Sequence, residues 1–372
     1  MVYKNTYRKL KVVCDADDVL MSCNEYALHL LSVATGNKYD LSEITDWGIL
    51  GKEIDQRMDY FNTDFFYNTQ PALNGARKFL ISLMEKADVF IATAVAPEHM
   101  GERIAKIQEL FPEFPVDHII MGIRKDLLQG DIMLDDKIDN LLESNCNLPV
   151  LFRQPWNQSA SGICCVDNYE DFLTLVDFMN GDKVAVSRIP KILCIVGPSG
   201  SRKQDLADYI CMNSSIFERI STCTTARPRK AGANRVSQDE FDRIHKAGEF
   251  IETTWYNHER FGIRKNDIDR ALKKGKYPVI VMDISGCLSV YNVYPGQCEI
   301  IYADRNKRDC VMSIIQKPAL KREQIADRII SFEFEEKNKV LADHIVKITS
   351  TGSGSMYDEV IDIVRYLQLG QE

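Results

Sequence analysis

Two carboxylates directly after a short apolar run could take part in phosphoryl chemistry. Asp15 and Asp17 follow residues 10–14, with one residue between them. If that run is a strand, both carboxylates lie at the carboxyl edge of a parallel sheet, where open α/β sheets bind their ligands. Aspartate is also common in turns. For this pair alone, an acidic turn without chemistry is therefore an equal alternative.

Other polar side chains also stand at or just after the ends of apolar runs. They are Thr93, Lys125, Asp135 and Asp136. Because the carboxyl ends of parallel strands meet at one edge of a sheet, we expect a hydroxyl, an ammonium group and two pairs of carboxylates to converge there. Carboxylate oxygens are the ligands that Mg²⁺ prefers. A lysine adds positive charge where phosphoryl oxygens accumulate negative charge.

This ordered set resembles the haloacid-dehalogenase superfamily of phosphatases, and most of all the 5′(3′)-deoxyribonucleotidases, over about residues 9–180. The stretches GDIMLDD (130–136) and RQPWN (153–157) share in the likeness. The resemblance implies that Asp15 is the nucleophile that forms an aspartyl-phosphate. It implies that Asp17 first protonates the leaving oxygen and then activates water. By the same resemblance Thr93 and Lys125 hold the phosphoryl oxygens.

The expected cofactor of this first site is Mg²⁺, and the expected substrate is a nucleoside monophosphate. The carboxylates expected at the metal are Asp15, Asp17, Asp135 and Asp136. Residues 20–72 lie where the family places a small helical cap, and they are rich in aromatic side chains. Phe65 and Phe66 are the candidates for lining the substrate pocket. The alternative is that these rings form the core of the cap itself.

A second group of residues follows the apolar run 191–196. A phosphate loop has the pattern Gly-x-x-x-x-Gly-Lys-Ser/Thr, in which backbone amides cradle phosphates. Gly197 and Lys203 fit that pattern. Arg202 stands where the second glycine belongs, and Gln204 stands where the Mg²⁺-binding hydroxyl belongs. An arginine side chain there resists the backbone conformation that glycine adopts freely.

The surroundings of this loop nevertheless resemble guanylate kinase over about residues 190–370. The stretches GPSGSRK (197–203), STCTTARPR (221–229) and DEFDRIHKAGEFIE (239–252) carry the likeness. The residues to which it assigns phosphate or nucleotide contacts are Gly197, Ser199, Gly200, Lys203, Arg229, Glu252, Asp283 and Arg328. Ala226 and Ile263 depart from the family pattern. We therefore expect a degenerate domain that binds a nucleotide such as ATP or GMP, or that has a regulatory role. An active nucleoside monophosphate kinase and a non-catalytic scaffold module are the alternatives.

The elements that position these residues alternate along the chain. Strands are expected at 10–14, 88–93, 118–121, 132–134, 150–152, 191–196, 279–282 and 299–302. Helices are expected at 24–33, 97–110, 265–274, 322–340 and 357–367. Short apolar strands between amphipathic helices predict α/β domains built on parallel sheets with helices on both faces. We expect two such three-layer domains, at residues 1–183 and 189–372.

Composition restricts the partners. Residues 1–190 carry 18 Lys and Arg against 29 Asp and Glu, whereas residues 191–372 carry 28 against 25. A pI of about 5.4 disfavours a nucleic-acid partner. No apolar run is long enough to span a membrane, and the 11 cysteines show no zinc-site spacing. We expect a cytoplasmic protein with buried free thiols, whose partners are its substrate and, in a homo-oligomer, a second copy of the chain.

Overall fold

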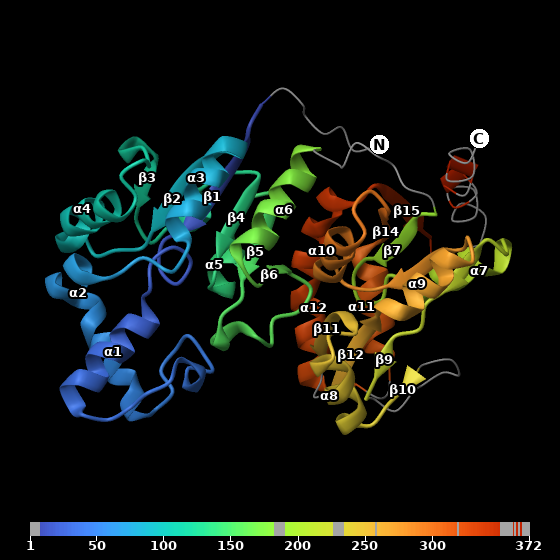
Figure 1. Cartoon of the computed structure of the whole chain (residues 1–372), viewed down its shortest axis with the longest axis horizontal. Coiled ribbons are helices and arrows are strands. Elements are labelled where there is room, and N and C mark those ends of the chain that lie inside the picture. Colours follow the sequence, from blue (N-terminus) through green and yellow to red (C-terminus); the bar gives the residue numbers. More distant parts are fainter. Residues whose placement is uncertain are drawn as a thin grey trace. The chain divides into compact units, whose positions relative to one another are not determined.

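The computed structural model describes residues 8–181, 190–225, 234–256, 259–317 and 320–349, together with 360, 362–363 and 365–366. Contacts divide it into two units, one within Lys4–Gly181 and one within Asp182–Glu372. Each unit is built on its own parallel sheet (Figure 1). Among the described helices, none combines the length and the apolar character needed to cross a bilayer.

A six-stranded sheet forms the centre of the first unit, in the order β3-β2-β1-β4-β5-β6. Every neighbouring pair in it is parallel. The strands are β1 (Leu10–Asp15), β2 (Ala87–Thr93), β3 (Ile119–Met121), β4 (Ile132–Asp135), β5 (Leu148–Phe152) and β6 (Cys164–Val166). Strands β4 and β5 are buried throughout, as expected for strands covered on both faces. The predicted parallel sheet is confirmed, and β6 is an additional strand.

Helices surround this sheet. They are α3 (Ala76–Lys86), η3 (Pro97–His99), α4 (Met100–Leu110), η4 (Val116–His118), η5 (Lys125–Leu127), α5 (Ile138–Glu143), η6 (Pro155–Asn157) and α6 (Tyr169–Asn180). Local sequence explains both ends of α6. Asn168 caps its N-terminus, where the Asn168 side chain accepts a hydrogen bond from the backbone N–H of Asp171. Gly181 caps its C-terminus in the left-handed conformation.

The segment between β1 and α3 is largely helical, and we call residues 24–69 the cap. It contains α1 (Asn24–Thr35), η1 (Leu41–Glu43), η2 (Glu53–Asn62) and α2 (Asp64–Thr69). One apolar cluster in it joins Leu28, Ile44 and Ile54 to Trp156. A second cluster is formed by Cys23, Ala27 and Phe66. These clusters hold the short helices together, because each helix is too short to be stable alone.

The second unit has a five-stranded parallel sheet in the order β15-β14-β7-β13-β8. The strands are β7 (Ile192–Val196), β8 (Phe217–Arg219), β13 (Tyr277–Val281), β14 (Cys298–Arg305) and β15 (His344–Ile348). A separate four-stranded sheet, β10-β9-β12-β11, contains antiparallel pairs. Its strands are β9 (Cys223–Thr224), β10 (Asn234–Arg235), β11 (Phe250–Tyr256) and β12 (Glu259–Arg264). The parallel sheet was predicted, whereas the antiparallel one was not.

Helices also flank the sheets of the second unit. They are α7 (Lys203–Asn213), α8 (Gln238–Lys246), α9 (Lys265–Lys273), α10 (Ile284–Val293), α11 (Lys307–Ile315), α12 (Arg322–Lys337) and η7 (Asn338–Leu341). The expected helix over 322–340 corresponds to α12 followed by η7. Within the expected helix over 357–367, the described residues 360, 362–363 and 365–366 are helical, and the other positions lie outside the described residues. An apolar cluster that includes Leu193, Ile195 and Tyr277 packs on α7 through Leu206 and Ile210.

Candidate functional site

The loop after β1 has a fixed, unusual backbone. Asp18 has a φ of 53°, in the left-handed region that few residues other than glycine adopt. Its carboxylate accepts hydrogen bonds from the backbone N–H of Cys23 and from both the backbone and the side-chain amide of Asn24, at 2.6–3.2 Å. Burial raises the pKa of Asp18 to about 7. This internal carboxylate shapes the loop that carries Asp15 and Asp17.

Asp15, Lys125 and Asp135 form a buried charged group at the end of β1. The Nζ atom of Lys125 lies 2.7 Å from Asp15 Oδ1 and 2.8 Å from Asp135 Oδ2. All three side chains are less than 10% exposed. Asn140 donates a further hydrogen bond to each oxygen of Asp135, at 3.0 and 3.1 Å. The group is therefore held rigidly from three different segments of the chain.

Asp136 completes an acidic cluster with Asp15 and Asp135. One oxygen from each of the three carboxylates lies within 4.8 Å of the others, and all three residues are buried. Asp136 Oδ2 accepts hydrogen bonds from the indole nitrogens of Trp47 and Trp156, at 3.0 and 2.9 Å. Trp47 belongs to the cap, whereas Trp156 follows β5. One carboxylate oxygen thus links the cap to the acidic cluster.

Burial changes the acidity of these groups. Burial, then the charge of Asp135, raises the pKa of Asp15 to about 7, although Lys125 opposes the shift. The pKa of Asp136 is raised well above its usual range by burial and by Asp135. Burial alone would lower the pKa of Lys125, but the charges of Asp15 and Asp135 outweigh it and raise that pKa. The site therefore has more negative charge than its one lysine neutralises, which favours a bound cation.

Thr93 lies at the same edge of the sheet. It ends β2, and its neighbour Ala92 pairs with Asp15 in the register of the two strands. The Thr93 side chain is fully buried, and its Oγ1 has no hydrogen-bond partner among the described residues. A buried hydroxyl without a partner costs free energy. It is thus available to an incoming polar ligand.

The carboxylate of Asp17 has different hydrogen-bond partners from those of the acidic cluster. Arg103 Nη2 lies 3.0 Å from each Asp17 oxygen, and Gln70 Nε2 donates to Asp17 Oδ1 at 2.9 Å. The group of clustered carboxylates contains Asp15, Asp135 and Asp136, and not Asp17. Neither Arg103 nor Gln70 was a sequence-based candidate.

The two aromatic candidates of the cap lie in different surroundings. Phe66 is 1% exposed and packs with Cys23 and Ala27, whereas the neighbouring Phe65 is 60% exposed. Phe61 and Tyr67 meet the Phe66 ring edge-on, at 5.4 and 5.9 Å between centroids. In this structure Phe66 therefore contributes to the core of the cap, and Phe65 faces solvent.

The loop between β7 and α7 contains three residues with positive φ angles. Gly197 and Gly200 have φ angles of 142° and 87°, and at each a Cβ would collide with backbone of the unit. Arg202 adopts the left-handed conformation with a φ of 66°, at the position where the pattern has glycine. Its side chain turns outward to Asp205, 2.9 Å away. Lys203 Nζ donates to the carbonyl of Gly197.

A carboxylate from α12 already occupies this loop. The backbone N–H of Ser199 donates to Glu335 Oε2 at 3.0 Å. Arg328, from the same helix, donates to the Ser199 hydroxyl at 3.1 Å. Burial raises the pKa of Glu335, and the positive charge of Lys203 opposes that rise. The structure thus brings together Ser199, Lys203 and Arg328, with Glu335 as an unpredicted fourth member.

Glu252 and Asp283 form a second acidic group in this unit. Asp283 caps α10 by accepting a hydrogen bond from the backbone N–H of Gly286 at 2.8 Å. The Glu252 carboxyl packs against Gly286, where a side chain would have no room. Burial, then the charge of Asp283, raises the pKa of Glu252 well above its usual range. The remaining candidate, Arg229, lies outside the described residues.

Comparison with known proteins gives each unit its own relatives. Residues 8–180 match the family of 5′ nucleotidase, deoxy (pyrimidine), cytosolic type C proteins, and residues 189–362 match the guanylate kinase family. The 5′(3′)-deoxyribonucleotidase of Bacillus subtilis is 28% identical over 177 residues, 44% of this chain and 96% of that protein. A guanylate kinase of Helicobacter pylori is 26% identical over 145 residues, 38% of this chain and 70% of that protein.

A human leucine-rich repeat and guanylate kinase domain-containing protein is 27% identical over 220 residues, which are 54% of this chain and 25% of that protein. The family matches agree with the resemblances noted in the two halves of the sequence. Residues 8–180 are therefore similar to deoxy 5′-nucleotidases, and residues 189–362 are similar to guanylate kinases.

Proposed function

We propose that the first domain hydrolyses (deoxy)nucleoside monophosphates through an aspartyl-phosphate on Asp15. The observation that carries this proposal is the buried group of Asp15, Lys125 and Asp135 at the carboxyl end of β1. A carboxylate at a strand end with an ammonium group 2.7 Å away is a nucleophile with its countercharge in place. The match to the deoxy 5′-nucleotidase family supports the substrate class.

The reaction proceeds in two steps. In the first, an oxygen of Asp15 attacks phosphorus, the bond from phosphorus to the nucleoside oxygen breaks, and Asp17 gives its proton to that oxygen. In the second, Asp17 takes a proton from water, the water oxygen attacks phosphorus, and the bond to Asp15 breaks to release inorganic phosphate. Thr93 and Lys125 hold the phosphoryl oxygens in both steps. A covalent intermediate replaces one difficult displacement by two easier ones.

Mg²⁺ is the cofactor that this acidic cluster fits. Asp15, Asp135 and Asp136 offer three clustered, buried carboxylate oxygens, and such hard donors suit a small divalent cation. When bound, Mg²⁺ supplies positive charge that offsets the carboxylates and the phosphate. Asp17 is kept for proton transfer, since its carboxylate is bonded to Arg103 and Gln70 instead.

Phosphate release by the full chain tests this proposal. The substrates are a panel of ribo- and deoxyribonucleoside 5′- and 3′-monophosphates, with Mg²⁺ or with EDTA. Release is expected with Mg²⁺ and is expected to vanish in Asp15→Asn, whereas the exposed control Asp117→Asn keeps it. Full activity in Asp15→Asn would refute the proposal.

For the second domain we propose nucleotide binding with a regulatory role and without efficient phosphoryl transfer. Gln204 replaces the Mg²⁺-binding hydroxyl, and its side chain accepts a hydrogen bond from Arg219 at 2.6 Å. Glu335 occupies the Ser199 amide that a phosphate would need. Both contacts oppose the arrangement of phosphates and metal ion that phosphoryl transfer from a nucleoside triphosphate requires.

Two measurements on the full chain test this second proposal. Calorimetry with GMP and with ATP is expected to show binding, and a coupled assay for ADP is expected to show none formed from ATP and GMP. ADP formation would establish the kinase alternative. Absence of any nucleotide binding would refute the proposal and favour the scaffold alternative.

A further inference from the structure

We propose that Arg103 and Gln70 are positioning residues for Asp17, and that cap helix α2 completes this arrangement by packing on α4. The inference rests on the proposed function, in which Asp17 transfers a proton to the leaving oxygen. It concerns the orientation of the Asp17 side chain.

The contacts around Asp17 close into a triangle. Arg103 Nη2 donates to both Asp17 oxygens, and Arg103 Nη1 donates to Gln70 Oε1 at 3.0 Å. Gln70 Nε2 then donates to Asp17 Oδ1 at 2.9 Å. Two donors from different elements therefore fix the plane of the carboxylate, because rotation of the Asp17 side chain would break at least one hydrogen bond.

Arg103 is an unusual residue for its place. It is 2% exposed, in the interior where arginine is almost never fully buried unless it is paired. Removing a guanidinium from water costs several kcal/mol. Its guanidinium donates hydrogen bonds to Asp17, to Gln70 and to Met21 Sδ. The burial of this charge is thus tied to a carboxylate of the candidate active site.

Helix α2 of the cap supplies half of the arrangement. Gln70 directly follows α2 as its C-cap residue. The ring of Tyr67 covers the Arg103 guanidinium, whose Cζ atom lies 4.7 Å from the ring centroid. Tyr67 also stacks on His99, with 5.1 Å between centroids. Arg103 and Gln70 therefore hold their geometry only while α2 is packed on α4.

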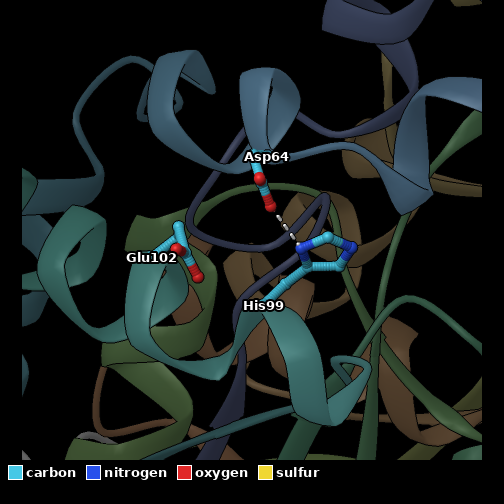
Figure 2. A group of neighbouring side chains, drawn as sticks. All are labelled: Asp64, His99 and Glu102. Atoms are coloured by element: carbon cyan, nitrogen blue, oxygen red, sulfur yellow. Dashed lines mark hydrogen bonds and ion pairs between the residues drawn. The ribbon is translucent and has the colours of Figure 1, made fainter.

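A polar contact fixes the other end of α2. His99 Nδ1 lies 2.7 Å from Asp64 Oδ1, and Figure 2 shows Asp64 pointing from α2 to this ring. Glu102, which precedes Arg103 on α4, lies beside the same pair (Figure 2). Asp64, Tyr67 and Gln70 thus attach one helix of the cap along the segment that carries His99 and Arg103.

This arrangement matters for the proton that the leaving group needs. A nucleoside leaves as an alkoxide and requires a proton, whereas p-nitrophenolate leaves without one. A displacement of about 1 Å in a positioned group costs about 100-fold in rate. Loss of the triangle is therefore expected to slow hydrolysis of nucleotides far more than cleavage of p-nitrophenyl phosphate.

The test compares kcat/KM for a deoxynucleoside 5′-monophosphate and for p-nitrophenyl phosphate, with Mg²⁺, in the full chain. Arg103→Lys and Arg103→Ala are expected to lose about 100-fold on the nucleotide, through kcat, and only about threefold on the aryl ester. Guanidinium ions at millimolar concentration are expected to restore part of the nucleotide activity of Arg103→Ala. Gln70→Leu, which keeps the Arg103–Asp17 pair, is expected to lose about tenfold with the same selectivity.

The control is Arg77→Ala, because Arg77 is an exposed arginine paired with Glu113 on the same domain. It is expected to leave both activities unchanged. Equal losses on the two substrates, or none on the nucleotide, would overturn the inference. If the Arg103 variants do not fold, the inference is tested by Gln70→Leu, through its loss of kcat/KM on the nucleotide relative to the aryl ester. A wild-type chain that releases no phosphate from any nucleotide contradicts the proposed function instead, so the two failures are distinguishable.

Discussion

Replacing the proposed nucleophile by its neutral isostere is expected to stabilise the metal-free protein. Asp15 is 6% exposed, and burial beside Asp135 raises its pKa from 3.8 to about 7. Because the pKa is higher in the folded state, the folded state binds this proton more tightly than the unfolded one. The stability that this group contributes is therefore full below about pH 4, declines as the pH rises to about 7, and is lost above that.

The size of the effect follows from the shift. A pKa change from 3.8 to about 7 corresponds to roughly 4 kcal/mol against the ionised form. Water entry and relaxation lower the effective penalty of a buried charge, so we expect Asp15→Asn to gain about 2 kcal/mol at pH 8. For a domain of this size, that is an increase in Tm of about 4–8 °C.

Differential scanning calorimetry in EDTA, at pH 8 and at pH 4, measures this gain. The gain is expected at pH 8 and is expected to be near zero at pH 4, where wild-type Asp15 is protonated. Asp18, whose pKa is also raised to about 7, titrates in both proteins, so the difference between them isolates Asp15. Asp117→Asn, on an exposed aspartate, serves as the matched control.

Two outcomes would refute this reasoning. A variant no more stable than wild type at pH 8 would mean that the ionised carboxylate is not penalised by its surroundings. An equal gain at both pH values would mean that the amide stabilises the fold for a reason other than charge. Mg²⁺ is expected to reduce the difference, because it stabilises the ionised wild-type site and not the amide.

Three further predictions concern other parts of the chain. Arg202→Gly relieves a left-handed φ of 66° and is expected to stabilise the second domain by about 0.5–1 kcal/mol, seen as a higher Tm; a lower Tm contradicts this. A thiol reagent is expected to modify only Cys211 in native protein at pH 8, because the other ten cysteines are buried. The reaction is expected to be slow, because burial raises the pKa of Cys211 to about 11. Rapid labelling of several thiols in native protein would contradict this. Mg²⁺ is expected to change the tryptophan fluorescence, because the indoles of Trp47 and Trp156 donate hydrogen bonds to Asp136. The variant Asp136→Asn is expected to abolish this change. A fluorescence response that survives in the variant would place the metal elsewhere.

Alternating apolar runs were enough to predict the parallel sheets and the sheet edge at which Asp15, Thr93 and Asp135 lie. Asp15, Thr93 and Asp135 each end a strand, so strand order alone places them at a common edge. The antiparallel sheet was missed although β11 and β12 have seven and six residues, and its other two strands, β9 and β10, have only two residues each. No periodic pattern can be read from so few positions.

The sequence could not predict contacts that depend on how the helices pack. Arg103 is a single arginine on an ordinary amphipathic helix, and its pairing with Asp17 depends on which face of α4 turns inward. Phe65 and Phe66 are neighbours on a helix of six residues, and no pattern says which of the two is buried. Glu335 is one of several acidic residues of α12, and its contact with Ser199 joins segments that are 136 residues apart.

The Glu335 contact has a consequence for any anion that enters the loop between β7 and α7. The amide of Ser199 and the charge of Lys203 already face a carboxylate, so a phosphate binds there by exchange and not by simple addition. The measured affinity of the phosphate then reflects the difference in free energy between its own contacts and those of the Glu335 carboxylate. Protonation of Glu335 at low pH weakens the carboxylate contacts and so favours the ligand. We therefore expect a multiply charged anion to displace the Glu335 carboxylate from this loop, and a weakly charged anion to leave it in place.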